Sequence, residues 1–209
     1  MKKYMDKLKR RIYFNKNLFL FLIVLVLVGV GAGALFSLIL SDGDKKLVTD
    51  YLNDFITNIS KSNFNFNVSF FNTVIFTLGF ALIIWLFGIS IIGILFVLPF
   101  LFIKSFVLGF SIGSILINFK FKGILLSLAY VVPHHVVNIM VYILISAYSI
   151  MISYRLFNSM REKKNFDFKL FMNKYLFILL FSLSILFISS LYEVFVLPNI
   201  MHFIVNLIK

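Results

Sequence analysis

The sequence predicts an all-α integral membrane protein, a polytopic helical bundle of about five transmembrane helices with further amphipathic segments outside the membrane. Three observations lead to this fold class. Hydrophobic residues make up 61% of the 209 residues, while charged residues make up only 13%, against roughly 25% in soluble domains. A soluble domain of this size leaves too much surface exposed to hide so many apolar side chains from water. Long uncharged stretches also recur along the chain, and their natural solvent is a lipid bilayer.

The first predicted span follows a basic N-terminal segment. Residues 1–17 carry seven Lys and Arg against one Asp, and residues 18–40 carry no charge. At 1.5 Å per residue the uncharged stretch can cross a hydrocarbon core of about 30 Å. It is longer than the apolar part of a cleavable signal peptide, so we expect an uncleaved helix. Gly29 and Gly33 form a G-x-x-x-G pattern for helix packing, within the chain or in a homo-oligomer.

Residues 41–72 form the longest segment that we expect outside the membrane, on the extracytoplasmic side. Apolar residues recur there at helical spacing, which predicts an amphipathic helix. Ser41, with Asp44 three positions later, resembles a capping box at its start. The helix either lies on the membrane surface or offers a docking surface to an extracytoplasmic partner. The residues proposed for docking are Tyr51, Phe55 and Ile59.

Residues 73–154 hold the second, third and fourth predicted spans. Pro99 cannot continue the hydrogen-bond ladder of a helix, and Lys104 would be costly at mid-bilayer. We therefore expect a turn at residues 99–104, with the second span ending at residue 98 and interrupted near Gly88–Gly93.

The third span is then expected to begin at Lys104. Gly109 and Gly113 give it another face of small residues for helix contact. Because this span is short, residues 91–118 form either a full span or a re-entrant segment.

The remaining segments are a basic loop at residues 155–174, a fifth span at residues 175–198 and an interfacial tail at residues 199–209. Fourteen of the twenty Lys and Arg fall on one side of this topology. The positive-inside rule then places the N-terminus in the cytoplasm and the C-terminus outside. The net charge of +12 is thereby explained by topology, and we expect no nucleic-acid partner.

The fourth span carries polar side chains at intervals of three or four residues, which align them along one helix face. This stripe must face the bundle interior, a subunit or a wet cavity. Glu193 is the only acidic residue inside a predicted span, and pairing with His134 or Tyr130 would neutralise it. The pair would fix helix register, relay a proton or ion, or couple to a partner helix. The predicted intramembrane network comprises Tyr130, Pro133, His134, Asn138, Tyr142 and Glu193.

The sequence shows no pattern of an enzyme. It lacks H-E-x-x-H, G-x-S-x-G and a phosphate loop, and it contains no cysteine. His134 and His135 are adjacent and lie about 100° apart around a helix, unlike the i, i+4 pair that shares a metal ion. We expect no catalytic residue, no metal and no cofactor.

The order and spacing of several segments resemble the stage II sporulation protein M family of endospore-forming bacteria over nearly the whole chain. The similar stretches are Gly88–Gly93, Phe102–Gly113, Val132–His134 and Glu193–Pro198. The family often has Pro-His-Gly-x-x-Glu where this chain has Pro133-His134-His135 followed by Asn138. The acid at position 138 is thus lost.

The resemblance implies a non-enzymatic membrane component of the engulfment machinery, located in the mother-cell membrane at the sporulation septum. It would anchor two peptidoglycan-cleaving partners, the stage II sporulation proteins D and P. The competing class is a transporter or channel-like subunit, in which the polar stripe and Glu193 form an intramembrane relay. Against it, five spans do not divide into equal inverted repeats.

Overall fold

The computed structural model describes residues 2–60, 66–162 and 168–200, and these ranges contain helices and no strand. The predicted all-α class is confirmed. The elements in chain order are α1 (Lys2–Leu38), α2 (Asp42–Ser60), α3 (Phe66–Gly88), α4 (Gly93–Leu126), the π-helical turn η1 (Ser127–Val131), α5 (Val132–Glu162), α6 (Phe168–Leu191) and the π-helical turn η2 (Tyr192–Val196).

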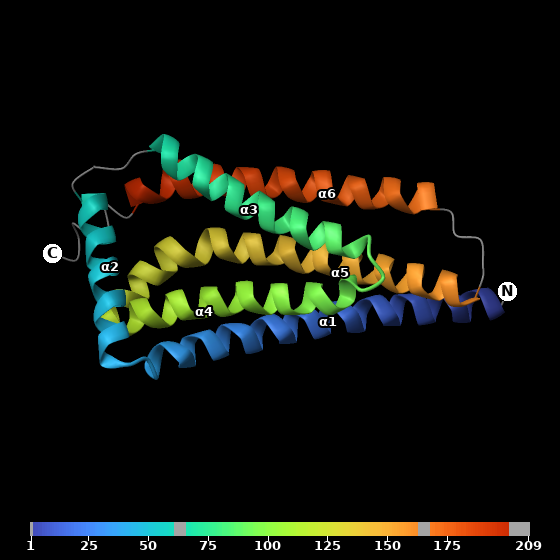
Figure 1. The fold of residues 1–209 in the computed structure, drawn as a ribbon, viewed down its shortest axis with the longest axis horizontal. Helices are drawn as coiled ribbons and strands as arrows, with labels where there is room; N and C mark the ends of the chain where they lie inside the picture. Colours follow the sequence, from blue (N-terminus) through green and yellow to red (C-terminus); the bar gives the residue numbers. More distant parts are fainter. Residues whose placement is uncertain (1, 61–65, 163–167, 201–209) are drawn as a thin grey trace.

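Within the described ranges, five helices are long and apolar enough to cross a membrane, as the sequence predicts. They run side by side along the long axis of the molecule, and α2 lies across one end of the bundle (Figure 1). The N-terminal end of α1, the end of α5 and the start of α6 lie together at the opposite end (Figure 1). The candidate spans are Lys16–Leu38, Ser69–Gly88, Gly93–Leu126, Val132–Arg161 and Phe171–Ile200.

The turn between the second and third spans lies at residues 89–92, so the prediction of a turn at 99–104 is wrong. Backbone hydrogen bonds from Ser90 to Phe87 and from Gly93 to Ser90 close the turn at 3.0 and 3.1 Å. A Cβ atom at Gly93 would overlap the carbonyl oxygen of Phe87, so the turn depends on glycine there.

Pro99 lies inside α4. A membrane helix tolerates proline when surrounding groups satisfy the freed backbone, which is why proline does not mark the boundary here. The third span is therefore a complete helix from Gly93, and the re-entrant alternative does not apply.

The third and fourth spans are joined at Lys120, whose backbone is non-helical (φ 47°, ψ −125°). The chain turns back there, and a Cβ atom at Gly123 would lie 2.6 Å from the carbonyl oxygen of Ile115. The last residues of α4, followed by η1 and α5, then run back through the bundle (Figure 1).

The α1 and α4 helices pack backbone to backbone through small residues. A Cβ atom at Gly29 would lie 2.8 Å from the Cβ of Ser105, and one at Gly33 would overlap the carbonyl oxygen of Phe106. From the other side, Cβ atoms at Gly109 and Gly113 would overlap α1. Both predicted glycine faces thus meet each other within this chain, where small side chains allow close approach.

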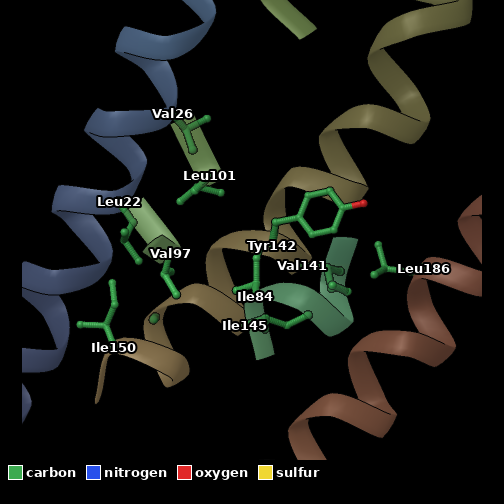
Figure 2. Packing of buried hydrophobic residues seen from close by; sticks show 12 residues of the cluster. Leu22, Val26, Ile84, Val97, Leu101, Val141, Tyr142, Ile145, Ile150 and Leu186 are labelled. Atoms are coloured by element: carbon green, nitrogen blue, oxygen red, sulfur yellow. The ribbon is translucent and has the colours of Figure 1, made fainter. Parts of the chain in front are cut away.

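The apolar core lies between all five spans. Side chains from α1, α3, α4, α5 and α6 converge on it (Figure 2). Tyr142 is the largest fully buried side chain in this cluster. Other members include Leu22, Val26, Ile84, Val97, Leu101, Ile145 and Leu186.

Candidate intramembrane polar site

The polar stripe on α5 and the preceding turn η1 faces the interior of the bundle. Its described members are all at most 4% exposed. They are Ser127, His134, Asn138, Tyr142, Ser146, Ser149 and Ser153. The side chain of Tyr130, which the sequence also assigns to this stripe, lies outside the described residues.

Two side chains of the stripe bond to the backbone of α3, and a third bonds to the turn that follows it. Tyr142 Oη donates to the carbonyl of Thr77 at 3.2 Å, and Ser149 Oγ donates to the carbonyl of Ile84 at 3.1 Å. Ser153 Oγ lies 2.7 Å from the carbonyl oxygen of Ser90 in the turn that follows α3. These bonds hold α5 against α3, because each gives a buried hydroxyl an acceptor.

Tyr175 of α6 joins the same network. Its hydroxyl donates to the carbonyl of Trp85 at 2.8 Å and lies 2.6 Å from Ser149 Oγ. The rings of Trp85 and Tyr175 stack with centroids 5.1 Å apart. The sequence does not distinguish Tyr175 as a network residue, because a tyrosine at the start of an apolar helix is also typical of a membrane interface.

His134 and Glu193 meet between α5 and η2. His134 Nε2 lies 3.8 Å from Glu193 Oε1, and the side chains are 1% and 22% exposed. This separation is longer than a hydrogen bond and close enough for strong electrostatic interaction in a medium of low dielectric constant. One α-helical turn earlier on α6, Ser189 Oγ donates to the carbonyl of His134 at 3.5 Å.

Glu193 lies within the π-helical turn η2, and His134 lies three residues after the end of η1. The N–H of Val132 bonds to the carbonyl of Ser127 in η1, and the N–H of Leu197 bonds to the carbonyl of Tyr192 in η2. Each bond spans five residues and accommodates one extra residue in the helix. Pro133 lies two residues after the end of η1 and, because proline lacks an N–H, cannot bond to an earlier carbonyl.

Lys104 also belongs to this site, although the sequence analysis placed it in a turn. Its ammonium lies 5.2 Å from the ring centroid of Phe80 and 5.8 Å from that of Tyr142, which are cation–π distances. The Gly88–Gly93 spacing was the available signal, because a turn there places Lys104 inside the next span.

His135 lies beside His134, with ring centroids 4.1 Å apart. The two imidazoles thus stay together, although their Cβ atoms project in different directions around the helix. Among the residues that the structure describes, no three His, Cys, Asp or Glu side chains gather in a way that could hold a metal ion.

The α2 helix, which carries the predicted docking residues, is held by its polar side. Ser41 Oγ accepts from the N–H of Asp44 at 3.2 Å and caps the helix. Thr49 Oγ1 donates to Asn118 Oδ1 of α4. Tyr51 is 73% exposed; the side chains of Phe55 and Ile59 lie outside the described residues.

The comparisons with known proteins bear on the whole bundle. Residues 21–198 match the model of the family Stage II sporulation protein M. No curated protein and no solved structure matches the chain. The match begins inside α1 and ends after η2, so it includes three of the candidate spans in full, most of the first and the fifth, and the polar site between them. The chain therefore belongs to the stage II sporulation protein M family and is a sporulation-related, multi-pass membrane protein.

Proposed function

We propose that this protein is a non-enzymatic membrane scaffold of the sporulation engulfment complex, which anchors peptidoglycan-degrading partners at the septal membrane. The family membership supports a role in sporulation. The partners implied by the sequence resemblance are the stage II sporulation proteins D and P.

The observation that carries the proposal is the setting of α2. This helix lies across the end of the bundle (Figure 1), and the Thr49–Asn118 hydrogen bond ties it to α4. Leu47 and Tyr51 on α2 are nevertheless 68% and 73% exposed. A preorganised apolar surface outside the spans lowers the entropic cost of binding a partner.

The proposed orientation brings this surface to the cell wall. Arg155 and Arg161 lie on the half of α5 that ends at the opposite end of the bundle from α2 (Figure 1). The positive-inside rule favours the cytoplasm for that basic end. The α2 helix would then face the space where peptidoglycan lies.

Photo-crosslinking from sporulating cells tests the scaffold role. A crosslinking amino acid at Tyr51 should capture a wall-degrading membrane partner. The matched control is Asn53, which is also exposed on α2 and lies about 200° away around the helix. Purification of the intact protein without any wall-degrading partner, from cells arrested during engulfment, would contradict the proposal.

The second candidate function is a transporter or channel-like subunit with an intramembrane relay. Lys104 and Glu193 favour it, because ionisable residues inside membrane spans mark many transport paths. Flux through proteoliposomes that contain the purified protein alone tests this function. A flux that is measured without any partner protein and that Glu193→Gln abolishes would support the transporter function.

A further inference from the structure

Lys104 lies near the middle of the membrane rather than at its surface. It is eleven residues beyond Gly93 and sixteen before Lys120, or about 16 Å and about 24 Å along a helix. Because the hydrocarbon core is about 30 Å thick, a turn at either end leaves Lys104 deep inside it. Its ammonium is held over the rings of Phe80 and Tyr142 and thus points between the helices.

Among the described side chains, the titratable groups around Lys104 come from two of the packed elements. The spans in α1 and α3 contain no ionisable side chain after Lys16, and Lys104 is the only one between Gly93 and Phe119. The α5 helix contributes His134, His135 and Tyr142. The η2 turn contributes Glu193, with Tyr192 as its chain neighbour.

These groups face the same interior of the bundle and form one acid–base cluster. His134 lies 3.8 Å from Glu193, the two imidazoles lie 4.1 Å apart, and the ammonium of Lys104 lies 5.8 Å from the ring of Tyr142 on the same stripe. With Lys104 cationic, Glu193 anionic and both histidines neutral, the cluster has no net charge. A low-dielectric interior favours such a balance.

One further proton would leave the cluster with a net positive charge. His134 Nε2 and Glu193 Oε1 are the groups placed to share it, since their separation of 3.8 Å needs only a small movement to become a hydrogen bond. On His134 the proton makes an imidazolium beside a carboxylate. On Glu193 it makes a neutral carboxylic acid beside a neutral imidazole.

Two further observations point to a ligand site here. Asn138 lies one helical turn from His134 and is 4% exposed, and its Oδ1 has no hydrogen-bond donor among the described residues. Buried acceptors of this kind are costly unless a donor reaches them. In addition, Glu193 lies within η2 and His134 lies three residues after the end of η1, and π-helical turns frequently occur at functional sites.

We infer that His134 and Glu193 form an intramembrane binding site for one proton, controlled by the charge of Lys104 and closed by the α5–η2 contact. The ligand is the proton itself, which moves between the imidazole nitrogen and the carboxylate oxygen without any other bond changing. This site is independent of the proposed partners, since it lies within one chain.

The chain allows a direct test, because Glu162 and Glu193 are its only glutamates. The full-length Glu162→Gln variant is labelled with carbon-13 at the glutamate side-chain carboxyl and placed in lipid nanodiscs. Its NMR spectrum then contains the carboxyl signal of Glu193 alone. The reverse variant, Glu193→Gln, reports Glu162 at the end of α5 as a matched control. The signal is followed between about pH 4 and 9, where carboxylates and imidazoles titrate.

The proton site predicts that Glu193 titrates in a step separate from Glu162 and coupled to its neighbours. In Lys104→Met the midpoint of Glu193 should shift, because a positive charge in the same low-dielectric interior is lost. Lys104→Arg keeps that charge and should therefore keep the midpoint of the unsubstituted protein. It serves as the decisive variant if Lys104→Met does not fold. His134→Gln should also move the midpoint, because coupled groups titrate as a pair.

Two results would overturn the inference. One is a Glu193 signal that does not titrate in this range. The other is a midpoint that neither His134→Gln nor a change of charge at Lys104 moves. Neither result depends on a wall-degrading partner, so failure of the proton site and failure of the scaffold role are distinguishable.

Discussion

Gly109 of α4 lies directly against the backbone of Val30 in α1, so that a Cβ atom at position 109 would overlap the Val30 carbonyl oxygen. The same is true of Gly33 against Phe106. These two contacts bring the first and third spans to backbone distance. Such an approach strengthens dispersion between helices, which is a main source of association in lipid, where helices gain little from the hydrophobic effect.

Adding one methyl group at this contact should therefore destabilise the bundle. We expect Gly33→Ala or Gly109→Ala to lower the free energy of unfolding by about 1–3 kcal/mol, the usual cost of overpacking. Reversible unfolding in mixed detergent micelles measures it. Gly31→Ala is the matched control, because nothing lies within 4 Å of the added atom. Equal stability of the Gly31 and Gly33 variants would refute the close packing.

The hydrogen bonds of Tyr175 should stabilise the other side of the bundle. Tyr175→Phe removes the hydroxyl that bonds to Trp85 and Ser149, and we expect a loss of about 0.5–1.5 kcal/mol for a bond of this kind. Ser149→Ala should add little in the Tyr175→Phe background, since both residues share one network. Tyr51→Phe, on an exposed tyrosine, should leave the unfolding curve unchanged.

The His134–Glu193 pair should tolerate polar replacement better than apolar replacement. Glu193→Gln keeps a hydrogen-bond acceptor beside His134, whereas Glu193→Leu leaves a buried imidazole and Lys104 without the carboxylate. We expect the second change to cost about 1–3 kcal/mol, more than the roughly 0.6 kcal/mol of an average intramembrane hydrogen bond. A double-mutant cycle with His134→Leu measures the coupling. Full additivity would mean that the two residues do not interact.

Cysteine labelling tests the proposed orientation without background, because the native chain contains no cysteine. An impermeant thiol reagent on intact cells with the wall removed should label Asn53→Cys on α2. It should not label Met160→Cys near the end of α5 until the membrane is permeabilised. Both positions are exposed in the structure, so accessibility alone does not separate them. Labelling of Met160→Cys on intact cells would reverse the topology.

The sequence by itself determined the all-α class, the five spans and the amphipathic α2 helix. These follow from local properties, because mean hydropathy over a span and apolar spacing along a helix need no knowledge of neighbours. The small residues at Gly29, Gly33, Gly109 and Gly113 were visible in the same way. A small-residue face, however, does not specify its partner, and only the tertiary structure shows that the two faces meet each other.

The tertiary structure alone decided where the third span begins and what surrounds Lys104. Proline and lysine predict a boundary when each is judged for a single helix in lipid. In the bundle, aromatic rings from α3 and α5 receive the ammonium, and the turn forms between Gly88 and Gly93 instead. The cost of a buried charge depends on groups that other helices bring to it, and a pattern read along one helix does not contain them.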